Sequence, residues 1–126
     1  MVLLDADVMI DLMRGFPGAV AWMRSLTEPV GIPGYAMLEL IAGCRSTADV
    51  QRVNRETAAM RVLWPSRPHC ERALQDYKTL LLSHGVGAFD ILIGHTAIEL
   101  RLPLHTFNVK HYGAVPGLTT IQPYIR

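Results

Sequence analysis

Residues 1–10 read MVLLDADVMI, an apolar run that two carboxylates, Asp5 and Asp7, interrupt. The first four residues have the length and composition of a buried strand, and the residues after Asp5 have helical spacing. A charge moved out of water costs several kcal/mol unless it is paired or binds a metal. We therefore expect these acids to meet positive charge where the strand ends.

Four more short apolar runs follow, and they alternate with segments of helical spacing. Further strands are expected at residues 30–33, 60–64, 102–107 and 118–122. Helices are expected at residues 7–15, 17–26, 35–44, 47–60, 66–85 and 90–101. This alternation predicts an α/β domain with a mostly parallel sheet of four to five short strands, buried on both faces.

The composition is that of one ordinary globular domain, which we expect to span residues 1–126. Half of the residues are hydrophobic and the net charge is +1, which excludes a disordered or strongly charged chain. No segment reaches the roughly 20 uninterrupted apolar residues of a membrane span, and no signal peptide is visible. We therefore expect a cytoplasmic protein with no membrane association. Cys44 and Cys70 form no C-x-x-C pair and are expected to be reduced thiols.

Three of the eleven acidic residues stand where an aliphatic residue would fit the pattern better. They are Asp5 in VLLDADV, Glu39 in MLELIAG and Asp90 in AFDILIG. An isolated buried carboxylate raises its pKa and becomes neutral, whereas several that converge need a cation to stay ionised together. The alternative interpretation is that each acid caps a helix or strand end, or pairs with an arginine.

The expected elements bring these acids toward one place. Asp5 ends the first strand, Asp90 begins the helix before the fourth strand, and Asn108 follows that strand. In open parallel sheets, ligands bind outside the carboxyl ends of the strands, and a helix starting there would carry Glu39 past the same cleft. Carboxylate and amide oxygens suit Mg²⁺ or Mn²⁺ better than zinc. Metal-activated water at such a site favours phosphodiester hydrolysis.

Four segments in this order resemble the PIN-domain family, in particular the small VapC-type toxins of bacterial toxin–antitoxin modules. They are LLDADVMIDLMRG, IPGYAMLELIAGC, GAFDILIGHTAIELRLPLHTFNVKHY and a short closing strand. The resemblance covers essentially the whole chain. It implies a three-layer α/β/α fold and a Mg²⁺- or Mn²⁺-dependent endoribonuclease that cuts RNA. It also implies a homodimer that a cognate antitoxin holds inactive.

The same resemblance implies roles for individual residues. Its motif acids correspond to Asp5, Glu39 and Asp90, which are the implied metal ligands and catalytic residues. Asn108 and Thr106 match the late T-x-N/D motif, so Asn108 is an implied catalytic residue. Asp7 stands where the family commonly has asparagine, which implies a supporting role or an occasional ligand.

Two positions depart from the family pattern. Ala6 replaces a common threonine or serine, which removes a hydroxyl near the acids. His111 stands where many members have an acid. The cleft therefore has fewer negative charges, and we expect one tightly held ion rather than two. A non-toxin housekeeping nuclease and a catalytically weak RNA- or partner-binding regulator stay open as alternatives.

Other features have two interpretations each. Six arginines between residues 45 and 72 could follow phosphates, or form a solvated face with pairs such as Arg52 with Glu56. Leu12, Met13 and Phe16 are candidates for a groove that receives an apolar antitoxin segment. His95 lies one turn beyond Asp90, but a core or surface position is favoured over the cleft.

Overall fold

The computed structural model describes residues 1–126 and contains one five-stranded sheet in the order β3-β2-β1-β4-β5. The strands are β1 (Val2–Leu4), β2 (Val30–Pro33), β3 (Arg61–Leu63), β4 (Leu104–His105) and β5 (Thr120–Ile121). Every neighbouring pair is parallel. The predicted parallel sheet is confirmed, and each of the five expected strands is present within its apolar run.

Seven helices connect the strands. They are α1 (Ala6–Met13), α2 (Pro17–Ser25), α3 (Gly34–Ala42), α4 (Thr47–Thr57), α5 (Arg67–His84), α6 (Ala88–Leu100) and α7 (Val109–Tyr112). Six of these match the expected helices with small shifts at their ends. The short α7 is missing from the prediction because four residues are too few to show a helical period.

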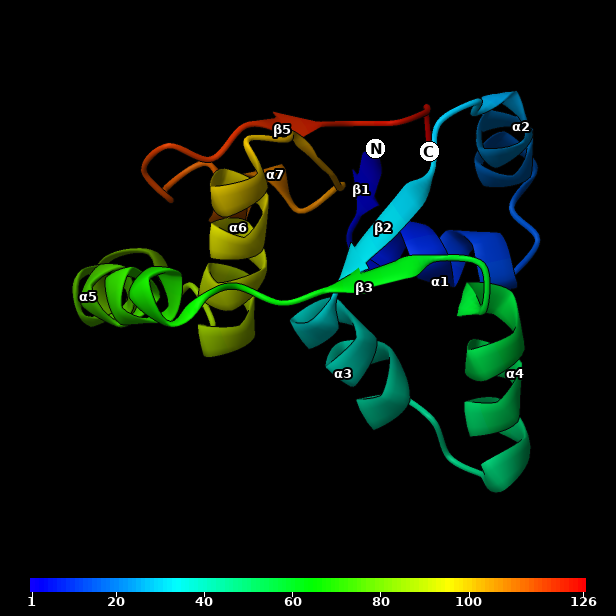
Figure 1. The fold of residues 1–126 in the computed structure, drawn as a ribbon, viewed down its shortest axis with the longest axis horizontal. Coiled ribbons are helices and arrows are strands. Elements are labelled where there is room, and N and C mark those ends of the chain that lie inside the picture. The colour runs from blue at the N-terminus through cyan, green and yellow to red at the C-terminus, as the bar shows by residue number, and fades with distance from the viewer.

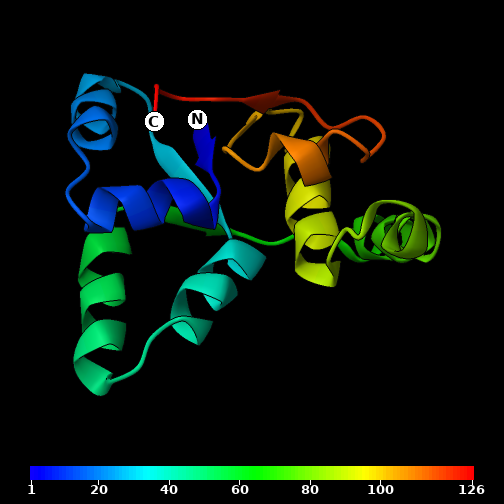
Figure 2. The same ribbon diagram turned by 180° about the vertical axis from the view of Figure 1, so that it is seen from behind.

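The helices enclose the sheet in a three-layer α/β/α arrangement. Figure 1 shows α5 and α6 together at one end of the molecule and α2 and α4 at the other. In the reverse view, α1 crosses in front of the sheet (Figure 2). Leu3, Leu4 and Ile32 are fully buried, as strands covered on both faces require. No helix is long and apolar enough to cross a membrane.

Parallel pairing places the ends of the central strands at one edge. Leu3 is in register with Gly31 and Leu104, and Leu4 with His105. Helix α1 begins directly after β1, and α3 begins directly after β2. The residues that follow β1, β2 and β4 therefore share the carboxyl edge of the sheet, where the sequence predicts the site.

A buried carboxylate that the sequence reasoning did not single out ties α1 to the end of the chain. Asp11 is 8% exposed and accepts hydrogen bonds from the Tyr124 hydroxyl (2.8 Å) and from Nε (2.9 Å) and Nη2 (3.2 Å) of Arg126. The guanidinium also lies 4.4 Å from the centre of the Phe107 ring. The Arg126 hydrogen bonds, helped by Tyr124, hold the pKa of Asp11 below its usual 3.8 although burial opposes this.

Asp11→Asn should lower the free energy of unfolding by about 1–2 kcal/mol at pH 7, because charged hydrogen bonds contribute about that much and exposure of Arg126 weakens them. Since the pKa of Asp11 is lower in the folded state than 3.8, its stabilisation is present above about pH 3.8 and lost as pH falls through the folded value. Urea denaturation at pH 7 measures the loss of stability in the variant, and the same measurement below pH 3.8 shows whether this loss disappears in acid. Glu56→Gln, on the exposed face of α4, is the control. A difference between wild type and D11N that does not shrink in acid contradicts the assignment.

Candidate functional site

A threonine hydroxyl joins the two acids that follow β1. Asp5 caps α1, with Oδ1 accepting the Ala6 N–H at 2.8 Å and Oδ2 accepting the Thr106 hydroxyl at 2.9 Å. The same hydroxyl lies 3.2 Å from Oδ2 of Asp7, which also accepts the Phe107 N–H at 2.8 Å. Thr106 thus provides a hydroxyl to both acids. Because it has one proton, it can donate to only one of the two carboxylates at a time.

The acids lie close enough to repel one another. Burial, and then the charge of Asp7, raises the pKa of Asp5 from 3.8 to about 6. Burial, followed by the charges of Asp5, Asp90 and Asp7, raises the pKa of Glu39 from 4.5 to about 7. Burial also raises the pKa of Asp90, against the opposing effect of His111. Four carboxylates from three elements therefore gather at the carboxyl edge of the sheet, as the sequence predicts.

Asp90 and Asn108 occupy this edge in different ways. Asp90 lies in the first turn of α6, and its Oδ2 is 3.9 Å from Nδ1 of His111. Asn108 is the residue before α7, and its backbone N–H donates to the Thr106 hydroxyl at 3.0 Å. The Asn108 side chain makes no hydrogen bond with the acids. The structure thus brings Asn108 to the edge of the cluster but shows no contact for its amide.

The sequence reasoning missed Tyr112, the last residue of α7. Its side chain is 1% exposed, and its hydroxyl is the only buried side-chain polar atom that lacks a hydrogen-bond partner. Burial and then the charges of Asp5 and Asp90 raise the pKa of this phenol well above 10. A tyrosine four residues after Asn108 was visible in the motif, but its local sequence gave no sign that the hydroxyl turns toward the acids.

The residues fit a hard divalent cation, although their side chains do not form a finished ligand set. No three His, Cys, Asp or Glu side chains are arranged to hold a metal ion together as they stand. The donors at the edge are carboxylate oxygens, which suit Mg²⁺ and Mn²⁺. Their raised pKa values and the unpaired Tyr112 hydroxyl both indicate uncompensated charge and polarity at this place. A bound cation would relieve the repulsion.

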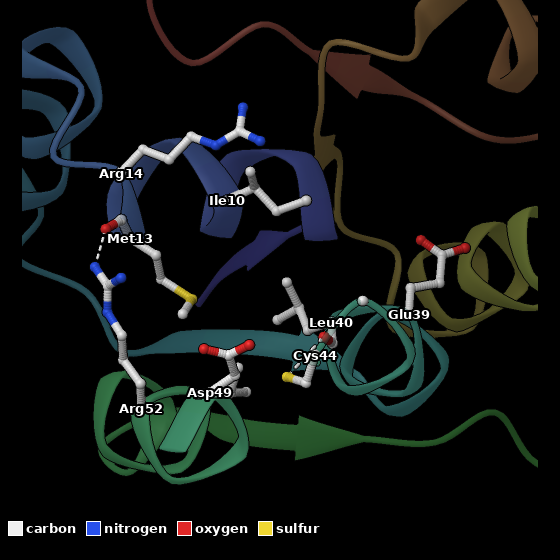
Figure 3. A pocket seen from close by; sticks show the side chains of 10 residues that line it. Ile10, Met13, Arg14, Glu39, Leu40, Cys44, Asp49 and Arg52 are labelled. Carbon is white, nitrogen blue, oxygen red and sulfur yellow. Dashed lines mark hydrogen bonds between the residues drawn. The ribbon is translucent and has the colours of Figure 1, made fainter. Parts of the chain in front are cut away.

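A groove of about 470 Å³ runs between α1, α3 and α4, and Glu39 lies at one end of it (Figure 3). Ile10, Met13 and Leu40 form part of its apolar lining, and Arg14 and Arg52 lie toward the other end. Arg52 donates to the backbone carbonyl of Met13. The Arg52–Glu56 pair, an example from one of the two open interpretations of these arginines, is not among the ion pairs of the structure.

Only one of the three groove candidates from the sequence lines this groove. Met13 does, whereas Leu12 lines a separate depression beside Met9 and Val20. Phe16 packs on the ring of Tyr124, with ring centres 5.8 Å apart. Of the three candidates, Met13 alone therefore faces this groove.

His95 faces away from the acids. It is 1% exposed, its Nε2 lies 2.6 Å from Oδ2 of Asp76, and its Nδ1 lies 3.3 Å from Nδ1 of His69. The expected core position is thus confirmed. Asp76 is half-buried in this contact between α5 and α6. Both cysteines are free, as predicted.

Comparisons with known proteins identify the family of the chain. Residues 2–114 match the PIN domain family. The chain is 36% identical over 115 residues to Ribonuclease VapC10 of Mycobacterium tuberculosis, covering 89% of this chain and 86% of that protein.

Solved structures share the fold at lower identity. A toxin–antitoxin complex from Klebsiella pneumoniae superposes with a TM-score of 0.77 at 24% identity over 100% of both chains. VapBC2 from Rickettsia felis, bound to a fragment of promoter DNA, gives a TM-score of 0.77 at 18% identity, covering 96% of this chain and 98% of that one. With a family match over most of its length and a relative at 36% identity, this chain belongs to the PIN domain family.

Proposed function

We propose that residues 1–126 form a single PIN domain that acts as a metal-dependent endoribonuclease, the toxin of a toxin–antitoxin pair. Its substrate is cellular RNA, so the cytoplasm is its place of action. The observation that carries the proposal is the position of Glu39 at the carboxyl edge of the sheet, where burial and then the charges of Asp5 and Asp90 raise its pKa to about 7. Arginine pairing does not explain this cluster, since no ion pair of the chain joins one of these acids to an arginine. Helix capping accounts for Asp5, which caps α1, but not for Glu39 in the interior of α3.

In this proposal Asp5, Glu39 and Asp90 hold one Mg²⁺, or Mn²⁺ in its place, and Asn108 is a further polar group at the rim. When bound, the ion supplies an activated water and offsets charge on the phosphate. Thr106 keeps Asp5 in position from β4, and the backbone N–H of Phe107 keeps Asp7 beside it. Asp7 thereby supports the cluster from outside the proposed ligand set.

We also propose that a cognate antitoxin occupies the groove that ends at Glu39. The lining combines apolar side chains with two arginines, Arg14 and Arg52, and two acids, Glu39 and Asp49, which suits an amphipathic segment whose polar face carries both signs of charge. The structures similar to this chain include toxin–antitoxin complexes. Occupation of the groove would cover Glu39 and so block the acidic edge. We expect the toxin to be a homodimer, as the family resemblance implies.

Asp90→Asn and Glu39→Gln should each reduce RNA cleavage by about 100-fold or more, because each removes a ligand charge while preserving shape. The assay is cleavage of total cellular RNA by purified protein in Mg²⁺, Mn²⁺ or chelator. Glu71→Gln, an exposed acid on α5 paired only with Arg67, is the matched control and should cut normally. Cleavage that persists in chelator would refute the metal site, and inert wild-type protein free of antitoxin would favour a binding role.

Ile10→Lys should weaken the complex with the antitoxin by about tenfold or more, because it places a charge on the apolar wall of the groove. Ile10 is 37% exposed, so the fold should tolerate the change. Titration calorimetry with the product of a small adjacent reading frame measures the affinity. Ile125→Lys, at a position 93% exposed and outside the groove, is the matched control. Equal affinities for the two variants would place the antitoxin elsewhere.

A further inference from the structure

The hydroxyl of Tyr112 has no partner in a place where partners are normally required. The side chain is the largest fully buried one in the protein, and its oxygen makes no hydrogen bond. Native proteins pair nearly all buried polar atoms, because an unpaired one loses its bonds to water and gains none. Such an exception at a candidate active site indicates that the hydroxyl serves a state other than the metal-free one.

The surroundings of this hydroxyl are acidic. Asp5, Asp90 and Glu39 all contribute to holding the phenol protonated, after the larger effect of burial. The hydroxyl in turn lowers the pKa of both Asp5 and Asp90, so it lies close to their carboxylates. A protonated phenol is a hydrogen-bond donor, and its neighbours here are acceptors.

The other donors at the edge are already committed. The two oxygens of Asp5 accept the Ala6 N–H and the Thr106 hydroxyl. The Asp90 carboxylate has the imidazole of His111 at 3.9 Å, which is beyond hydrogen-bond length. Of Asp5 and Asp90, the two carboxylates whose pKa the hydroxyl lowers, only Asp90 accepts no hydrogen bond from another side chain, although the Gly87 backbone also lowers its pKa. Tyr112 is the side-chain donor without an acceptor.

We propose that Tyr112 is a positioning residue of the metal site, whose hydroxyl donates to the Asp90 carboxylate when the acids close around a divalent cation. The inference rests on the proposed function, because the cation is what draws the carboxylates together. Carboxylates that bind metals are themselves held by hydrogen bonds from neighbouring groups, which fix the direction of their lone pairs. Helix α7 thus contributes to the site through its last residue as well as through Asn108 and His111.

Tyr112→Phe tests this assignment, because it removes one oxygen and preserves the ring. Mn²⁺ affinity, measured by electron paramagnetic resonance of free Mn²⁺, should fall about tenfold in the variant. Unfolding in chelator should be unchanged or need more urea, since the metal-free protein loses only an unpaired hydroxyl. Tyr77→Phe, in the half-buried part of α5, is the matched control and should leave Mn²⁺ affinity unchanged.

Three results would overturn the assignment, and they differ in what else they overturn. Equal Mn²⁺ affinity of wild type and Y112F removes the positioning role and leaves the proposed function intact. If Y112F is less stable than wild type in chelator but binds Mn²⁺ equally well, the hydroxyl stabilises the fold and does not position a metal ligand. Wild-type protein that binds no Mn²⁺ removes the metal site itself, and the role of Tyr112 with it.

Discussion

The parallel pairing of β1 with both β2 and β4 is the constraint on which the rest of the structure depends. Because of this pairing, the chain leaves β1, β2 and β4 at the same edge of the sheet. Asp5, the start of α3 and Thr106 therefore lie at this edge, although they are distant in sequence. The hydrogen bond from Thr106 to Asp5 spans 101 positions of the chain and exists only because of this pairing. Helix α6 then adds Asp90 from the side of the sheet that it covers. The chemistry of the site thus follows from sheet topology.

Like charges at this edge work against stability, and the fold compensates only in part. Asp5 and Asp7 receive backbone and hydroxyl donors, and Asp90 has His111 nearby, but Glu39 keeps a pKa raised to about 7 by burial and by its acidic neighbours. Asp11 in α1 offers a contrast, because Arg126 pairs with it and lowers its pKa. The chain itself therefore satisfies Asp11, whereas Asp5, Glu39 and Asp90 would be satisfied best by a ligand.

The sequence was sufficient for the sheet, six helices and the location of the acids, because each depends on local patterns or on the general rule for parallel sheets. It was insufficient for contacts between distant residues. Three features join segments that no sequence periodicity connects. They are the pairing of Asp11 with Arg126, the pairing of His95 with Asp76, and the buried position of Tyr112 near the acids. Arg52 shows the same limit, since its spacing allowed a pair with Glu56 and its partner is the carbonyl of Met13. Roles at the site came from the family resemblance more than from spacing.

In the proposed site, Asp5, Glu39 and Asp90 surround one divalent ion at the carboxyl edge of the sheet. Anomalous scattering from crystals grown with Mn²⁺ tests it most directly, because manganese is located without reference to the side chains. The account predicts one strong peak within coordination distance, about 2–2.5 Å, of oxygens from all three residues. A peak elsewhere, or none at an Mn²⁺ concentration that supports RNA cleavage, would contradict it.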